Sequence, residues 1–167
     1  NEIAPIEDTE GVFTYEYDFE NYTATVKSYT DESGTITDVK VPRTVVNEED
    51  GETYTVTHLA TTLFFGATAI ENVYLPDTLI KIGSGAFFNT SSLKTVYMPD
   101  SIEEIGRQAF TNSSIAGDLY IPESLVKFSE IASSHMVYED YYNYEGVAVF
   151  ANCVNLKKVV FSEGIKK

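Results

Sequence analysis

Side chains suited to nucleophilic or metal chemistry are few in this 167-residue sequence. Cys153 is its single cysteine, and His58 and His135 are its two histidines. A cysteine nucleophile needs a positioned base, and a zinc site needs three or four ligands at defined spacing; the sequence indicates neither. We therefore expect no catalytic residue, no metal site and no cofactor. We interpret Cys153 as a buried structural residue.

Acidic residues are abundant, but their arrangement does not indicate a site. The run at residues 48–52 (EEDGE) lacks the alternating oxygen ligands of a calcium loop. Because Asp50-Gly51 lies between β-prone segments, we predict a tight hairpin turn there. Residues 83–85 (GSG) lack the third glycine and the long helix of a phosphate-binding loop. A glycosidase needs a pair of carboxylates, but in a chain with so many acidic residues such a pair is expected by chance and does not indicate an active site. An enzyme is therefore the weakest hypothesis.

The charge and the hydropathy pattern exclude two classes of partner. The chain has 26 Asp and Glu against 11 Lys and Arg, a net charge of −15. It should repel nucleic acid and anionic membranes. No segment approaches the roughly 20 apolar residues that span a bilayer, so we expect no direct membrane insertion. Residues 1–11 do not resemble a signal peptide, which we expect to lie outside this sequence.

Tyrosine is the side chain that recurs most regularly. The chain has 12 Tyr and no Trp, and Tyr74, Tyr97 and Tyr120 each lie two residues before a proline. Those prolines, Pro76, Pro99 and Pro122, are 23 residues apart. The same period separates Phe64, Phe87 and Phe110. A period of about 20–29 residues is typical of leucine-rich repeats, whose units enclose a core only by stacking.

Each unit shows the elements that would position these tyrosines. In LKTVYMP, inward Leu93, Val96 and Met98 alternate like a strand that ends at the proline. The segments GSGAFF and GRQAFT predict one short helical turn each. Asparagine recurs two residues after the phenylalanine, and we expect its side chain to bond the backbone of a neighbouring coil. These asparagines are Asn89, Asn112 and Asn152.

The pattern P-x-[ST]-[LI]-x-x-I-G-x-x-A-F-x-N resembles the BspA-type leucine-rich repeats of bacterial surface proteins, from about Val39 to the C-terminus. The resemblance implies a β-rich, right-handed leucine-rich-repeat solenoid with a parallel sheet on its concave face. We expect residues 1–36 to form an N-terminal β-hairpin cap and residues 37–167 to form about four coils in one structural domain. Insertions interrupt the coils near residues 46–57 and 129–146. Phe128-Ser129 departs from the Ile-Gly of the pattern.

Two groups of residues are candidate binding sites. The three tyrosines should point out of the concave sheet, roughly 4.8 Å apart in a ladder. The ladder would serve as a ligand platform, or would only stabilise the sheet. The insertion is either a binding loop or a flap packed on the solenoid. Neighbours of the ladder are Asn72, Thr95 and Asp118, and the insertion carries Tyr138, Tyr141, Tyr142 and Tyr144.

The sequence favours recognition over catalysis. The resemblance implies a secreted or cell-surface adhesion and interaction module, and the residues favour a protein or glycan ligand. Two alternatives stay open. The chain could be a structural spacer that carries other domains, or a carbohydrate-binding accessory of a surface system.

Overall fold

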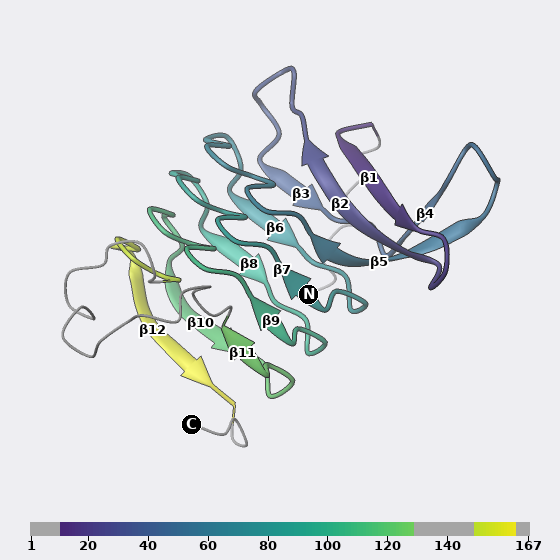
Figure 1. Ribbon diagram of the computed structural model, residues 1–167. Helices are drawn as coiled ribbons and strands as arrows, with labels where there is room; N and C mark the ends of the chain where they lie inside the picture. Colours follow the sequence, from purple (N-terminus) through teal and green to yellow (C-terminus); the bar gives the residue numbers. More distant parts are fainter. Residues whose placement is uncertain (1–10, 129–148, 163–167) are drawn as a thin grey trace, which may run out of the picture.

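The chain folds into stacked coils built from short strands (Figure 1). The computed structural model describes residues 11–128 and 149–162. Strands are the only regular elements in these two ranges. They are β1 (Phe13–Asp18), β2 (Thr23–Tyr29), β3 (Asp38–Lys40), β4 (Thr44–Val46), β5 (Thr53–Leu59), β6 (Asn72–Tyr74), β7 (Lys81–Ile82), β8 (Thr95–Tyr97), β9 (Glu104–Ile105), β10 (Gly117–Ile121), β11 (Lys127–Phe128) and β12 (Leu156–Phe161).

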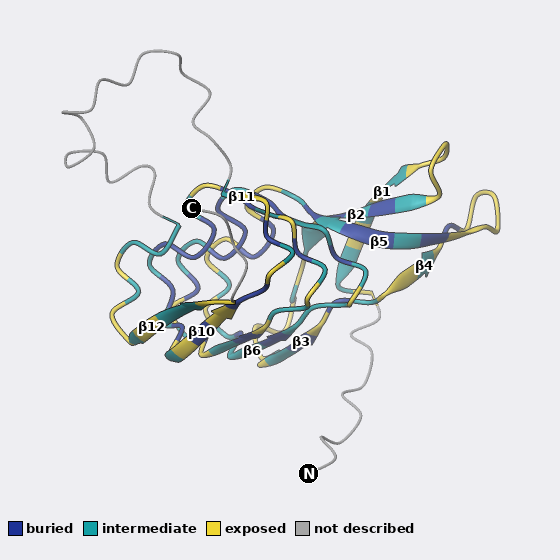
Figure 2. Cartoon of the chain, turned by 90° about the horizontal axis from the view of Figure 1, so that it is seen from below, coloured by how far each residue is buried: buried dark blue, intermediate teal, exposed yellow. Residues whose placement is uncertain are grey.

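The strands form parallel sheets on two sides of the coils (Figure 2). One side carries β3-β6-β8 and, separately, β10-β12; the other carries β5-β7-β9-β11, extended by β2, β1 and β4. The pairing follows the 23-residue period: Val73 lies opposite Val96, and Ile82 lies opposite Ile105. The period read from the sequence is therefore the register between β6 and β8 and along β5-β7-β9-β11. The insertions lengthen it elsewhere, so that Val39 lies opposite Val73 and Leu119 lies opposite Val159.

A column of phenylalanine rings occupies the core. Phe64, Phe87 and Phe110 are fully buried. Their ring centroids are 5.1 Å and 5.0 Å apart, with interplanar angles of 17° and 5°. Phe150 continues the column at 5.5 Å from Phe110. Because each ring lies mostly between rings of other coils, a coil buries its aromatic side chain only when its neighbours are present.

The glycine of the Ile-Gly pair sets how closely the coils approach. A Cβ on Gly83 would lie 2.5 Å from the carbonyl carbon of Ala60. A Cβ on Gly106 would lie 2.3 Å from the backbone nitrogen of Ser84. Backbone atoms cannot yield as a flexible side chain can, so only glycine fits at these two positions.

The recurrent asparagines form a ladder, but with partners other than those expected. Asn112 Nδ2 donates to Asn89 Oδ1 at 2.8 Å, and Asn152 Nδ2 donates to Asn112 Oδ1 at 2.9 Å. All three residues have a φ between 54° and 58°. This shared left-handed backbone aligns the amides, so they bond one another instead of the neighbouring backbone. Asparagine tolerates this conformation better than most residues.

The segments expected to be helical turns contain no helix within the described residues. Ala86 N donates to Gly83 O, and Phe88 N donates to Gly85 O. Each is a single hydrogen bond between residues i and i+3, as in a β-turn. Gly85 and Asn89 have φ values of 60° and 58°. Because a right-handed helix cannot continue through a left-handed residue, the chain bends twice and leaves only hydrogen-bonded turns.

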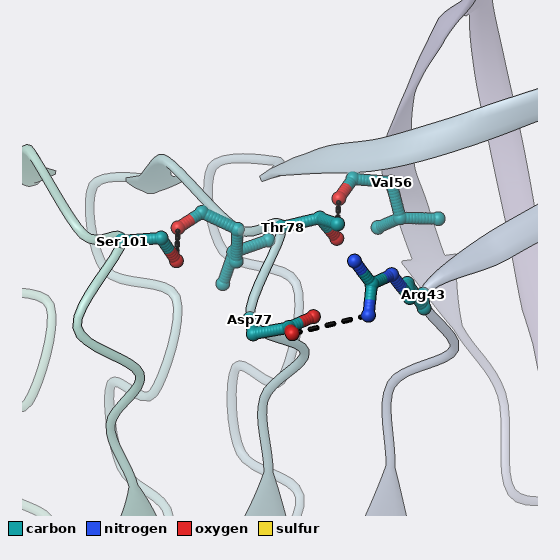
Figure 3. A network of polar contacts seen from close by, with 6 residues as sticks. Arg43, Val56, Asp77, Thr78 and Ser101 are labelled. Atoms are coloured by element: carbon teal, nitrogen blue, oxygen red, sulfur yellow. Dashed lines mark hydrogen bonds and ion pairs between the residues drawn. The ribbon is translucent and has the colours of Figure 1, made fainter.

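A row of hydroxyls links the coils after each proline (Figure 3). Thr78 Oγ1 donates to Val56 O at 2.8 Å, and Ser101 Oγ donates to Leu79 O at 2.6 Å. Ser124 Oγ makes the same bond with Ile102 O at 2.6 Å. The [ST] position of the repeat therefore satisfies a carbonyl of the preceding coil. The nearby Arg43–Asp77 ion pair, at 3.1 Å, is exposed and contributes little.

Two hairpins extend the molecule beyond the coils at the end opposite β12 (Figures 1 and 2). β1 and β2 pair antiparallel, and β2 pairs parallel with β5. Tyr29 packs at 5.1 Å on Phe64, the first ring of the phenylalanine column. β4 and β5 form the second hairpin, and Gly51 has a φ of 76° in its turn. The hairpin predicted from Asp50-Gly51 is confirmed.

Two glycine substitutions should lower the stability of the fold by unequal amounts. Gly106→Ala should destabilise the fold by about 3 kcal/mol or more, because the methyl group overlaps backbone. Gly85→Ala should cost only about 1 kcal/mol, the penalty of a left-handed alanine. The nearest atom to a Cβ at Gly85 is 3.5 Å away. Urea denaturation measures both, and equal losses would show that coil spacing is not set at Gly106.

Candidate ligand-binding face

Two of the predicted tyrosines lie side by side on the β3-β6-β8 sheet. Tyr74 pairs with Tyr97 in the β6–β8 register, next to the buried pair Val73 and Val96. The two rings are 4.4 Å apart with an interplanar angle of 10°. Tyr97 is 45% exposed. The strands therefore hold a stacked pair of rings at the surface, supported by packed valines.

Polar groups flank this pair on the same sheet. Asn72 lies opposite Thr95, and Asn72 Nδ2 donates to Asp38 Oδ1 at 2.9 Å. Burial raises the pKa of Tyr74, and its hydrogen bond with Tyr97 and the charge of Asp38 act in the same direction. The Tyr74 hydroxyl thus stays protonated near neutral pH, and it can donate and accept hydrogen bonds. We name Asn72, Tyr74, Thr95 and Tyr97 the tyrosine face.

Tyr120 departs from the expected ladder. β10 pairs with β12 and not with β8, so the sheet is interrupted between Tyr97 and Tyr120. Tyr120 is 65% exposed, and no ring contact joins it to Tyr97 in the described part of the chain. Asp118 lies opposite Lys158 on β12, away from the tyrosine face. The three-tyrosine ladder is therefore reduced to a pair, with Tyr120 and Asp118 on a separate sheet.

A one-residue shift explains the interruption. Leu93 is buried in one coil, and in the next coil Ile115 is buried in its place only 22 residues later. One residue is then left over before the strand. Gly117 lies in this longer stretch and has a φ of 75°. The β10–β12 pairing is irregular at the same place, because it passes from Gly117↔Leu156 to Asp118↔Lys158. The isoleucine and the following glycine were visible in the sequence, since glycine at a strand often marks a bulge.

A charged row that the sequence analysis missed lies on the opposite side of the coils. His58, Lys81, Glu104 and Lys127 occupy equivalent positions on four paired strands, 23 residues apart. Lys81 Nζ lies 3.1 Å from Glu104 Oε1, and Lys127 Nζ lies 3.4 Å from Glu104 Oε2. Glu104 is thus held between two lysines. The row ties strands together and presents no free acid–base pair.

The remaining candidate residues show structural roles where they are described. Cys153 Sγ donates to Phe110 O at 2.9 Å, and burial raises the pKa of its thiol. A thiol of raised pKa is a poor nucleophile. In residues 11–128 and 149–162, no group of three or more His, Cys, Asp or Glu could hold a metal ion. His135 and the insertion tyrosines Tyr138, Tyr141, Tyr142 and Tyr144 lie outside the described residues.

Stacked parallel coils with a 23-residue register define a leucine-rich-repeat protein. The chain belongs to the BspA type leucine-rich repeat region family, whose pattern matches residues 57–167 in six copies. The sequence resemblance is therefore confirmed. A comparison with curated proteins finds no match. Among the described residues, no helix is long and apolar enough to cross a membrane.

Solved structures share the fold. A leucine-rich repeat protein from Bacteroides capillosus ATCC 29799 is 25% identical with a TM-score of 0.70, covering 91% of this chain and 95% of that one. The leucine-rich repeat protein of T. pallidum is 20% identical with a TM-score of 0.59, covering 92% and 82%. A leucine-rich cell surface protein from Faecalibacterium prausnitzii A2-165 is 22% identical with a TM-score of 0.60, covering 99% and 45%.

His58 should make stability depend on pH. Burial, followed by the charge of Lys81, lowers the pKa of His58 in the folded state, against a smaller opposing effect of Glu104. The unfolded chain, with a histidine pKa of about 6.5, then binds more protons as the pH falls. Stability is therefore lost as the pH falls through the unfolded pKa.

A His58→Gln variant should lose less stability than the parent protein between pH 7.5 and pH 5.5. The measurement is the urea midpoint of both proteins at the two pH values. Most carboxylates titrate below this window, at about pH 4, so the difference between the two proteins reports on His58. Identical pH dependence in parent and variant would contradict the assignment.

Proposed function

We propose that this chain is the interaction module of a secreted or cell-surface bacterial protein, and that its tyrosine face binds a protein or glycan ligand. The observation that carries the proposal is the stacked pair of Tyr74 and Tyr97 on a packed sheet. Although its ring is stacked, Tyr97 is 45% exposed. Membership of the BspA type family and likeness to bacterial leucine-rich-repeat proteins, one of them a cell surface protein, support the placement at the surface.

Rigidity suits the tyrosine face to binding. The rings are held by stacking and by strand pairing, so little conformational freedom is lost when a ligand docks. Tyrosine adds large apolar area and a hydroxyl on a side chain with few torsions. Asn72 and Thr95 add amide and hydroxyl groups beside the rings. Such a surface recognises a ligand by shape, apolar contact and hydrogen bonds, and it needs no cofactor.

The β1–β2 hairpin has a supporting role in this proposal. It covers the edge of β5 through β2, and Tyr29 and Phe13 cover the first ring of the phenylalanine column at 5.1 Å and 6.3 Å. We assign it as the N-terminal cap of the solenoid, since an uncovered edge and an uncovered ring would invite association.

A structural spacer is the second candidate. The close stacking of Tyr74 and Tyr97 would by itself stabilise the sheet, by about 0.2–1 kcal/mol for a cross-strand pair. A chain with that role alone would have no ligand at this face. The two functions differ in what happens when the exposed ring is removed.

Tyr97→Ala should weaken ligand binding about tenfold or more, and Tyr74→Ala/Tyr97→Ala should abolish it, because the rings supply the apolar contact area. The measurement is binding to an array of purified extracellular proteins and to a glycan array, at a temperature where circular dichroism shows each variant folded. Tyr22→Ala is the matched control. Tyr22 is 54% exposed and stacks at 5.7 Å on Tyr54, at the β1–β2 turn.

If the double variant kept full affinity for every ligand that the parent protein binds, the tyrosine face would be removed from consideration. A parent protein that binds nothing on either array would favour the spacer. Equal losses in Tyr97→Ala and Tyr22→Ala would show that the effect is not local to the tyrosine face.

A further inference from the structure

A groove on the turn side of the coils is large enough for a small ligand. Its volume is about 550 Å³, and it crosses three consecutive turns, at residues 61–65, 84–88 and 107–108. Ligand pockets usually measure about 300–1,000 Å³. The groove shares no residue with the tyrosine face, and it takes no part in the function proposed above.

One wall of the groove is aromatic. Phe65 and Phe88 stack in parallel at 5.5 Å with an interplanar angle of 10°. Their sequence neighbours Phe64 and Phe87 are buried in the core, whereas Phe65 is 57% exposed. Stacking accounts for one side of the Phe65 ring, and more than half of its surface still faces solvent. This wall favours a ligand with an apolar face.

Arg107 places a positive charge at the groove. Its side chain is exposed and forms no ion pair within the described residues. Several other cations of this acidic chain do pair with carboxylates: Arg43, Lys81, Lys94 and Lys127. A guanidinium binds a carboxylate through two parallel hydrogen bonds, so the ligand that complements this charge is an anion of that kind.

Gly85 is buried and lines the groove between the turns that carry Thr62 and Gln108. Gly85 has a φ of 60°, and the equivalent residues Thr62 and Gln108 have φ values of 57° and 55°. The same bend therefore accommodates side chains in the neighbouring coils. A Cβ on Gly85 would make only ordinary contacts, the nearest at 3.5 Å from Thr62 Cγ2. Glycine relieves the strain of this left-handed backbone, but Thr62 and Gln108 show that the bend also forms with a side chain, and glycine adds no side chain to the groove.

We propose that this groove binds a carboxylated sugar of about disaccharide length. Three turns span two coil spacings of about 4.8 Å each, or about 10 Å. The apolar C–H face of the sugar packs on Phe65 and Phe88. Its hydroxyls meet the hydroxyl of Ser84 and the amide of Gln108, which both donate and accept hydrogen bonds. Its carboxylate pairs with Arg107.

The test compares carboxylated oligosaccharides with matched neutral ones, including a glucuronyl-glucose disaccharide against cellobiose and sialyllactose against lactose. An array identifies the sugar that binds, and calorimetry measures its affinity. We expect the carboxylated sugar to bind at least tenfold more tightly than its neutral counterpart. Arg107→Gln should reduce its affinity to that of the neutral sugar, since the charge-assisted bonds are lost. The Tyr74→Ala/Tyr97→Ala variant should bind it normally, which separates this site from the tyrosine face.

Gly85→Gln tests whether the space beside Gly85 must stay free for the ligand. The substitution gives this coil the side chain that the next coil carries at the equivalent position, Gln108. We expect at least a tenfold loss of affinity in a folded protein. Gly66→Asn is the matched control. Gly66 also has a positive φ, 69°, and its equivalents in later coils are asparagines, but it lies outside this groove. That variant should bind normally.

Three results would overturn the proposal. The first is the absence of binding by every carboxylated sugar, or equal binding of the neutral sugars. The second is full affinity in Gly85→Gln, or a loss in Gly66→Asn as large as that in Gly85→Gln. The third is displacement of the sugar by a hexaglutamate peptide of equal affinity, which would assign the groove to acidic protein segments.

Discussion

The close approach of successive coils is the constraint on which this structure depends. Gly83 and Gly106 bring backbones to distances that leave no room for a Cβ. At that spacing the phenylalanine rings stack at 5.0–5.1 Å, the hydroxyls after the prolines reach the carbonyls of the preceding coil, and the asparagine amides meet. Each contact repeats with the same geometry because each depends on one spacing. A coil displaced from its neighbour would lose all of them together.

The same spacing determines where function can arise. A side chain at one position of the repeat lies beside its equivalents, so surface chemistry is organised in rows. The tyrosine face, the row of His58, Lys81, Glu104 and Lys127, and the groove beside Phe65 and Phe88 all follow this rule. A row of equivalent side chains gains a local feature where the residue type changes from one coil to the next. Gly85 between Thr62 and Gln108, and Arg107 after Ser84, are two such differences.

The periodic sequence predicted the contacts that repeat, and it failed where one coil departs from the period. The family, the parallel pairing and the Asp50-Gly51 hairpin were predicted from the sequence, and so was the period at which the phenylalanines recur. In the part of the chain that the structure describes, hydrogen-bonded turns stand where helical turns were expected, because left-handed residues recur within each turn. The asparagines were recognised as a row but assigned the wrong partners. Tyr120 was placed in one ladder with Tyr97, although burial of Ile115 shifts its strand onto another sheet.

Apolar periodicity and the Ile-Gly pairs by themselves determined that this chain stacks into coils of 23 residues, since side chains of this kind are buried only between coils. Tertiary structure alone decided which surface rows stay intact and which side chains pair. Those outcomes depend on differences of about 2 kcal/mol between alternative local arrangements, such as burying Ile115 or Ala116, and such differences are settled by packing between coils rather than by the repeat pattern.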